Sequence, residues 1–180
     1  SLEVVGLSQT FGEGDNLICL LKLDAAGGVV DAVPFGDQGY ESSQVVRPLG
    51  DGGFVIAGNF SNPPQVEIVD AMVMKISRGG TLDWQRVYGS VGGSFALDVR
   101  QTSDGGYVVA GEAYNVPEGE FIVNRILVFK TDAAGNLQWR KLYGQGSTTS
   151  GTAVVERCSS GTCEGYIVLT RGQNSATSRI

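Results

Sequence analysis

The hydrophobic residues of this chain form short runs that are separated by glycine-rich polar stretches. Residues 54–57 (Phe-Val-Ile-Ala) and 107–110 (Tyr-Val-Val-Ala) are typical, because each run follows an Asp-Gly-Gly triplet and is rich in β-branched and aromatic side chains. Such runs, bounded by turn residues, predict β-strands joined by tight turns. No stretch of the sequence keeps a hydrophobic period near 3.6 residues, so we expect no helix.

The pattern repeats along the chain. Residues 104–111 (Asp-Gly-Gly-Tyr-Val-Val-Ala-Gly) match residues 51–58, which lie 53 residues earlier, and residues 164–169 are a weaker copy. A second motif is an apolar run that ends in a lysine and is followed by a glycine turn and an aromatic–glycine pair. Its lysines, Lys22, Lys75 and Lys130, are 53 and 55 residues apart. Two motifs that keep one period indicate a repeated supersecondary unit.

Each period predicts four strands, here called a to d. Strand a precedes the Asp-Gly-Gly triplet, for which we expect a two-residue hairpin turn, and strand b follows it. Strand c ends in the lysine, and strand d carries Trp84 or Trp139. Four antiparallel strands in about 54 residues match the size of a β-propeller blade. We therefore predict an all-β protein of the β-propeller type. A β-solenoid and other sheet folds, such as a sandwich, are the alternatives.

These motifs resemble the propeller-forming repeats of secreted and surface proteins of bacteria and archaea. The resemblance is carried by Gly-Gly-Tyr-Val-Val-Ala-Gly, by the Lys…Asp strand end with its Gly-Asn, and by Trp followed by Tyr-Gly, and it covers roughly residues 2 to 172. It implies kelch-like or quinoprotein-like blades and no shared catalytic residues. The first copy departs from the pattern, because Asp31 stands where the later copies have tryptophan.

The repeats predict a single domain over residues 1–172. It comprises a blade remnant (1–36), two whole blades (37–89 and 90–144) and a partial blade (145–172), with a polar tail at 173–180. This is about 3.3 blades, fewer than the four of a closed propeller. The chain begins within a repeat, so we interpret it as a mature or excised piece.

Both ends of the predicted domain align with strand b of a blade. The expected edge residues are Leu2, Val4, Val5, Tyr166, Val168 and Thr170. An open strand edge presents unpaired N–H and C=O groups, which favour pairing with another strand. We expect these edges to be completed by further blades of a larger polypeptide or by neighbouring subunits, in a ring or a filament.

The charge of the chain limits its partners. The net charge is −6, and the lysines and arginines form no cluster. Such a surface repels phosphate backbones and anionic lipid, so we expect neither nucleic-acid nor membrane-surface binding. The apolar runs are also far shorter than a membrane span.

The sequence contains no histidine. Histidine is the commonest general base and the commonest transition-metal ligand, so we expect no catalytic residues, no metal and no cofactor. Enzymes built on paired carboxylates, such as glycosidases, remain a remote alternative that would use Glu41, Glu118 or Glu120. We interpret these three residues as solvated loop carboxylates.

Two of the three cysteines lie where the other repeats have their short glycine turn. Cys158 and Cys163 flank residues 159–162, and the opposed ends of a hairpin lie within disulfide range. We predict a disulfide that reinforces an enlarged turn, with two free thiols or a metal pair as alternatives. A disulfide implies an oxidising compartment, so we expect an extracytoplasmic protein. Cys19 lies in an apolar run and is interpreted as a buried thiol.

Several aromatic and basic residues recur with the repeat. Repetition favours packing between blades, so we predict core positions for the recurring aromatic residues, which are Trp84, Trp139, Tyr88, Tyr143 and Phe35. Arg47, Arg100 and Arg157 recur in strand a and predict a ring of side chains. We expect them to bond turn carbonyls rather than to bind an anion.

The long connections, between strands b and c and between strands d and a, lie on one face of a propeller. We expect loops at residues 36–43, 59–69, 89–95, 112–124 and 145–151. The candidate ligand-binding residues in them are Tyr40, Glu41, Phe60, Asn62, Tyr114, Asn115, Glu118 and Glu120. Aromatic and amide side chains suit a glycan or another protein surface. Binding by this loop face is the alternative to the leading hypothesis, a non-catalytic structural module that assembles through its open edges.

Overall fold

The computed structural model describes residues 2–8, 17–35, 39–61, 68–89, 92–144 and 149–172. The regular elements in these ranges are all β-strands, as the sequence predicts. The strands are β1 (Leu2–Ser8), β2 (Leu17–Leu23), β3 (Val29–Phe35), β4 (Tyr40–Pro48), β5 (Phe54–Ser61), β6 (Asp70–Ile76), β7 (Leu82–Tyr88), β8 (Ser94–Gln101), β9 (Tyr107–Glu118), β10 (Phe121–Thr131), β11 (Leu137–Tyr143), β12 (Thr149–Ser159) and β13 (Thr162–Gly172).

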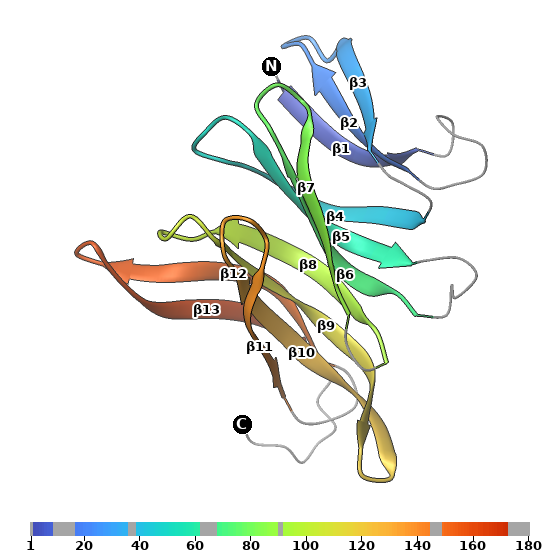
Figure 1. Cartoon of the computed structure of the whole chain (residues 1–180), viewed down its shortest axis with the longest axis vertical. Helices are drawn as coiled ribbons and strands as arrows, with labels where there is room; N and C mark the ends of the chain where they lie inside the picture. Colours follow the sequence, from blue (N-terminus) through green and yellow to red (C-terminus); the bar gives the residue numbers. More distant parts are fainter. Residues whose placement is uncertain are drawn as a thin grey trace.

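The strands form four antiparallel sheets in chain order (Figure 1). Sheet 1 is β1-β2-β3, sheet 2 is β4-β5-β6-β7, sheet 3 is β8-β9-β10-β11 and sheet 4 is β12-β13. Each four-stranded sheet takes its strands from one sequence repeat. In the part of the chain that the structure describes, the sheets follow one another as an open row and do not close into a ring.

Neighbouring sheets pack face to face through apolar side chains. On β6, Val73 packs toward sheet 3, whereas Met72 and Met74 pack toward sheet 1, because successive side chains of a strand point to opposite faces. A third core joins β9 and β10 of sheet 3 to Val154 of sheet 4. Sheets 2 and 3 are therefore apolar on both faces. This explains why their central strands read as nearly continuous hydrophobic runs rather than as alternating ones.

The Asp-Gly-Gly turns are longer than the two-residue hairpins that the sequence suggested. Thr102 N–H donates to the Gly106 carbonyl at 2.9 Å, and Gly105 N–H donates to the Thr102 carbonyl at 2.9 Å. Gly105 has a φ of 81°, so the connection is a three-residue loop that ends in a left-handed residue. At Gly106 a Cβ would overlap the Thr131 carbonyl oxygen. The first glycine therefore supplies the backbone angle, and the second allows close contact with strand β10.

The two repeated sequence motifs meet in space. Asp104, from the Asp-Gly-Gly turn, accepts hydrogen bonds from the Thr102 hydroxyl at 2.6 Å and from Lys130 Nζ at 2.9 Å. Lys130 is the lysine that ends strand c, and it is buried. In sheet 2 the equivalent pair, Asp51 and Lys75, lies 3.2 Å apart. The lysine thus holds the a–b turn against the end of the third strand, which explains why both motifs keep one period.

This contact predicts a dependence of stability on pH. The hydrogen bonds that Asp104 accepts from Thr102, Lys130 and Gly106 lower its pKa from 3.8 to about 2. A lowered pKa in the folded state stabilises the protein above the ordinary pKa, and that contribution is lost as the pH falls toward 2. We expect the variant Asp104→Asn to show a weaker loss of stability between pH 4 and pH 2 than the unmodified chain, measured as urea midpoints. Glu120→Gln, at an exposed turn, is the control. Equal slopes for Asp104→Asn and the unmodified chain would contradict this role.

A buried carboxylate links three of the sheets. Asp98, on β8, accepts from Arg47 Nη2 of sheet 2 at 2.7 Å and from Val154 N–H of sheet 4 at 3.0 Å. Arg100 lies 3.6 Å from the same carboxylate. The arginines therefore bind a carboxylate, not turn carbonyls as expected. The predicted ring of arginine side chains is also wrong at Arg157, its third predicted member. In the strand register Val155 stands at the position of Arg100, and Arg157 pairs with Glu164 near the β12–β13 turn.

The predicted disulfide is confirmed. Cys158 and Cys163 face each other directly in the register of β12 and β13, and their sulfurs are bonded. The turn between them is not enlarged, however. The strands continue to Ser159 and Thr162, and only Ser160 and Gly161 connect them, both with positive φ (50° and 83°). Two positive-φ residues make the compact turn that suits the strand twist of a two-residue hairpin. Cys19 is buried with a free thiol, as expected.

Candidate interaction site

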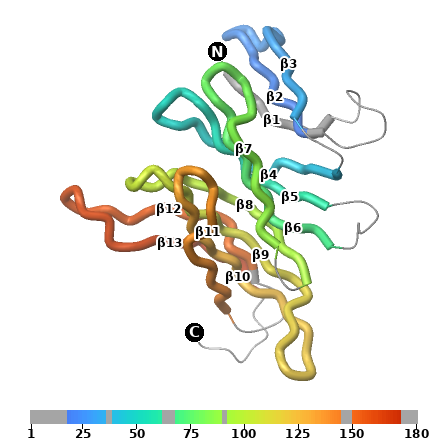
Figure 2. The backbone as a smooth tube through the Cα atoms, in the orientation of Figure 1, coloured from blue at the N-terminus to red at the C-terminus, as the bar shows by residue number. Residues whose placement is uncertain are grey.

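The residues predicted for a ligand-binding loop face are mostly part of strands. Tyr40 and Glu41 begin β4, Phe60 lies near the end of β5, and the connection expected at residues 112–124 is instead a long hairpin of β9 and β10. This hairpin projects beyond the sheets (Figure 2). Glu120 lies in its two-residue turn with Gly119, which has a φ of 61°. Asn62 lies outside the described residues.

Packing within the fold engages Glu41, Phe60 and Tyr114. Glu41 is 1% exposed, and Phe60 packs against the core between sheets 1 and 2. The ring of Tyr114 stacks on Phe95 with centroids 4.9 Å apart, and its hydroxyl accepts from Val69 N–H at 2.9 Å. Glu118 forms an ion pair with Arg125. The exposed candidates are Tyr40, Asn115, Glu118 and Glu120. Among the described residues, the candidates are therefore divided between packed side chains and exposed ones.

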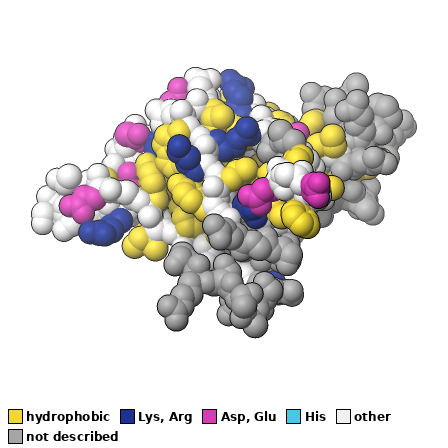
Figure 3. Space-filling view, turned by 90° about the horizontal axis from the view of Figure 1, so that it is seen from below, with side chains coloured by type: hydrophobic (Ala, Val, Ile, Leu, Met, Phe, Trp, Pro, Cys, Tyr) yellow, Lys and Arg dark blue, Asp and Glu magenta, His cyan; other side chains and the backbone are white. Residues whose placement is uncertain are grey.

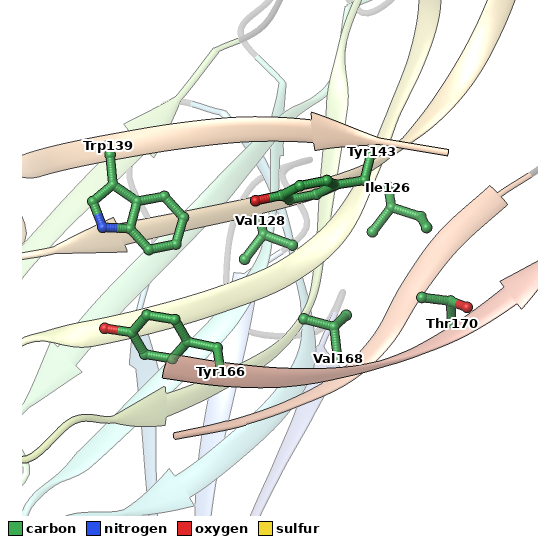
Figure 4. A pocket seen from close by; sticks show the side chains of 7 residues that line it. All are labelled: Ile126, Val128, Trp139, Tyr143, Tyr166, Val168 and Thr170. Carbon is green, nitrogen blue, oxygen red and sulfur yellow. The ribbon is translucent and has the colours of Figure 1, made fainter. Parts of the chain in front are cut away.

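Sheet 4 carries the residues predicted for one open edge, and they have a common environment. Tyr166, Val168 and Thr170 are alternate residues of β13, and all three line a groove of about 380 Å³ (Figure 4). We call it the β11–β13 groove. Its lining consists of Ile126, Val128, Trp139, Tyr143, Tyr166, Val168 and Thr170. Trp139 and Tyr143 lie on β11, on the opposite side of the groove from β13. In the part of the chain that the structure describes, the groove is therefore an uncovered part of the apolar junction between sheets 3 and 4.

The sequence assigned Tyr143 to the core, but the structure leaves it exposed. Tyr88, at the equivalent position of sheet 2, is 7% exposed, whereas Tyr143 is 51% exposed. Burial raises the pKa of the Tyr88 hydroxyl. The difference arises because β9 and β10 of sheet 3 both pack over sheet 2, whereas in the described residues sheet 4 consists of two strands. The same residue type in the same repeat position is thus buried once and exposed once.

The opposite face of β13 is also apolar and exposed. Ile167 and Leu169 are 55% and 65% exposed, and Val155 on β12 is exposed beside them. The residues at the same positions of β9 are Val108 and Ala110, and both are fully buried beneath sheet 4. Sequence comparison of the repeats could have identified Ile167 and Leu169, since they align with core residues. Figure 3 shows further hydrophobic side chains, interspersed with lysine and arginine, on the underside of the molecule.

The other predicted edge belongs to sheet 1. The backbone of β1 pairs with β2 in a continuous antiparallel register, in which Leu2, Val4 and Val5 oppose Leu23, Leu21 and Leu20. Within the described residues, β1 and β13 each have a hydrogen-bonded neighbour strand on one side. Both predicted edge strands are thus edge strands of their sheets.

No protein-family model matches the chain, and no curated protein matches its sequence.

The described residues contain no helix that is long and apolar enough to cross a lipid bilayer.

Proposed function

We propose that this chain is a non-catalytic interaction module of the β-propeller type. In this proposal each sheet is one blade, and the open end sheets are completed by further sheets of the same kind. These belong to the same polypeptide or to neighbouring copies in a ring or a filament. The observation that carries the proposal is the exposure of Ile167 and Leu169 at positions where the preceding sheet buries Val108 and Ala110.

The exposed face has the composition of a packing surface. Ile167, Leu169 and Val155 lie on adjacent strands, and Val155 is the register partner of Ile167. Burying a Leu, Ile or Val side chain contributes about 1.5 to 3 kcal/mol, so covering the three together favours association by several kcal/mol before the cost of lost motion. A face of this kind on a folded sheet is typical of a protein–protein contact.

The strand edge supports the same function. β13 is paired through its whole length to β12, and its other edge has no strand beside it in the described residues. An extended strand from another sheet can pair with such an edge through main-chain hydrogen bonds. An edge and an apolar face on one sheet favour assembly over binding by the loop face, because packing within the fold already engages most of the loop-face aromatic residues.

The disulfide supports an extracytoplasmic location. A bond between Cys158 and Cys163 persists in an oxidising compartment, and it closes the hairpin that presents the exposed face. We therefore place the module outside the cytoplasm, where assembly of such sheets would act in a secreted, periplasmic or cell-surface structure.

The proposal predicts association through the outer face of sheet 4. We expect the native mass of the purified chain, measured by light scattering over a range of concentrations, to rise above that of a monomer. The double variant Ile167→Lys and Leu169→Lys should remain monomeric, because two ammonium groups cannot be buried in an apolar contact without a large desolvation cost.

A matched control uses two apolar residues elsewhere that are more exposed than Ile167 and Leu169. Phe121 and Ile122, near the tip of the β9–β10 hairpin, are 74% and 72% exposed. The double variant Phe121→Lys and Ile122→Lys should associate as the unmodified chain does. An unmodified chain that stays monomeric up to millimolar concentration would overturn completion by neighbouring copies through this face.

A further inference from the structure

We infer that the β11–β13 groove is the docking site for a β-hairpin that adds its first strand to the free edge of β13. The hairpin places an apolar side chain over Tyr143 and a glycine-containing turn against Trp139. This inference rests on the proposed function and names the chemistry of the partner.

The junction between sheets 2 and 3 shows how such a groove is filled. There the β10–β11 hairpin covers β7, and Phe129 packs on Tyr88 with ring centroids 4.5 Å apart. The Tyr88 hydroxyl donates to the carbonyl of Gly135, in the β10–β11 turn, at 2.7 Å. Gly135 lies so close to Trp84 that a Cβ would come within 2.9 Å of the indole ring. An aromatic side chain and a glycine turn together therefore cover the tryptophan and the tyrosine.

The junction between sheets 3 and 4 has the first half of this arrangement. Trp139 packs on Tyr166 with centroids 5.7 Å apart, as Trp84 packs on Tyr107 at 5.6 Å. The second half is open, because Tyr143 is 51% exposed and lines the groove with Ile126 and Val128. The positions that Phe129 and Gly135 occupy over sheet 2 have no counterpart over sheet 3 among the described residues. Among the described residues, sheet 4 therefore has only the strands that correspond to β8 and β9. The groove lies where a hairpin that corresponds to β10 and β11 would pack.

The free edge of β13 is in the right place to receive the first strand of the hairpin. In sheet 3, β9 pairs with β10 from Tyr107 to Gly111, opposite Thr131 to Leu127. The equivalent stretch of β13 is residues 166–170, whose alternate side chains line the groove. A strand that pairs antiparallel with this stretch directs every second side chain into the groove. One bound β-strand can therefore both pair with the main chain of β13 and fill the groove with its side chains. A small apolar molecule cannot do both.

A comparison with sheet 1 indicates which side chains contact the glycine turn of the next sheet. Sheet 1 has Asp31 in place of the tryptophan and Phe35 in place of the tyrosine. The glycine of the turn that follows β6, Gly80, has no atom within 4 Å of its would-be Cβ, unlike Gly135. The glycine turn is therefore in close contact with the preceding sheet where that sheet has the tryptophan and the tyrosine hydroxyl. It is open where the preceding sheet has neither group. The β11–β13 groove has both groups.

The test uses the hairpin whose docking the structure already displays. A head-to-tail cyclised peptide of residues 125–144 is added to the intact chain, and amide hydrogen exchange is measured in residues 166–170. Cyclisation is needed because an isolated two-stranded hairpin is marginally stable. We expect exchange of these amides to slow roughly tenfold at saturating peptide. The bound strand must first dissociate, and this raises the free energy of the opening that exchange requires.

Matched variants separate groove binding from unspecific contact. Tyr143→Ser in the chain should abolish the protection, whereas Leu142→Ser, its exposed neighbour on the other face of β11, should leave it intact. In the peptide, replacing the residue that corresponds to Phe129 with serine should abolish protection, whereas replacing the one that corresponds to Val128 should not.

Each outcome decides the inference independently of the proposed function. Absence of protection, or protection that survives Tyr143→Ser, overturns the hairpin site. Concentration-dependent protection without peptide that Tyr143→Ser abolishes supports it, with a second copy of the chain as the source of the hairpin. A chain that associates through Ile167 and Leu169 but shows no peptide protection refutes only the groove inference. A monomeric chain whose edge the peptide protects refutes only assembly through the outer face.

Discussion

Replacing Tyr88 with alanine is expected to lower the free energy of unfolding by about 3 kcal/mol or more. The side chain is buried between sheets 2 and 3, packs on Phe129, and donates to the Gly135 carbonyl. Its removal leaves a cavity and an unpaired carbonyl, which both destabilise the junction. The change is measured by urea unfolding of the variant and of the unmodified chain. The dependence of the free energy of unfolding on urea concentration should be the same for both.

The same substitution at Tyr143 is the internal control. Because this side chain is half exposed in the β11–β13 groove, Tyr143→Ala should change the free energy of unfolding of the monomer by no more than about 0.5 kcal/mol. Measurements are made at low concentration so that association does not contribute. Equal losses at the two positions would show that the groove is filled in solution, and would contradict the description of an open site.

Removing the carboxylate of Asp98 is expected to lower the free energy of unfolding by about 3 to 5 kcal/mol. The carboxylate is buried, accepts two hydrogen bonds from Arg47, and accepts a third from the Val154 amide. Asp98→Ala leaves the Arg47 guanidinium and the Val154 N–H without these partners, and it weakens the contact of sheet 3 with both neighbours. Thermal or urea unfolding measures the loss.

A double-mutant cycle isolates the ion pair from the loss of packing. Arg47→Met and Asp98→Ala are measured singly and together, and we expect a coupling energy of at least about 1 kcal/mol, since the two residues are in direct contact. Asp31→Asn, an exposed position on β3, is the control and should be close to neutral. Additive effects of Arg47→Met and Asp98→Ala would contradict the role of this pair as a link between sheets.

The local features of the fold could be predicted from the sequence because they depend on neighbouring residues. The apolar runs predict the strands, and the spacing of Lys75 and Lys130 from their Asp-Gly-Gly triplets predicts that each repeat folds as one unit. The disulfide followed from the position of Cys158 and Cys163 on either side of a turn. Turn type was less accessible. Three-residue and two-residue loops use the same glycine-rich residues, and the choice between them depends on hydrogen bonds and strand twist.

The candidate site could be predicted only in part. Tyr166, Val168 and Thr170 were identified as edge residues from the alignment of the repeats, and the structure places them along the groove. The sequence predicts the loop-face candidates from the long connections between strands, which are expected on one face of a propeller. The structure extends β9 to Glu118 and begins β10 at Phe121, since polar residues such as Asn115 and Glu118 are compatible with a hairpin that projects into solvent.

By itself, the sequence determined that the chain is built of antiparallel strands, where the central part of most of them lies, and the repeat that relates one sheet to the next. These properties follow from side-chain periodicity and turn chemistry, which act over a few residues. The tertiary structure alone decided which repeated positions are covered. Tyr88 and Tyr143 have the same local sequence context, and one is buried while the other is open, because burial depends on which strands lie over them. The same holds for the contact of Arg47 with Asp98, which joins residues 51 positions apart and which no local pattern indicates.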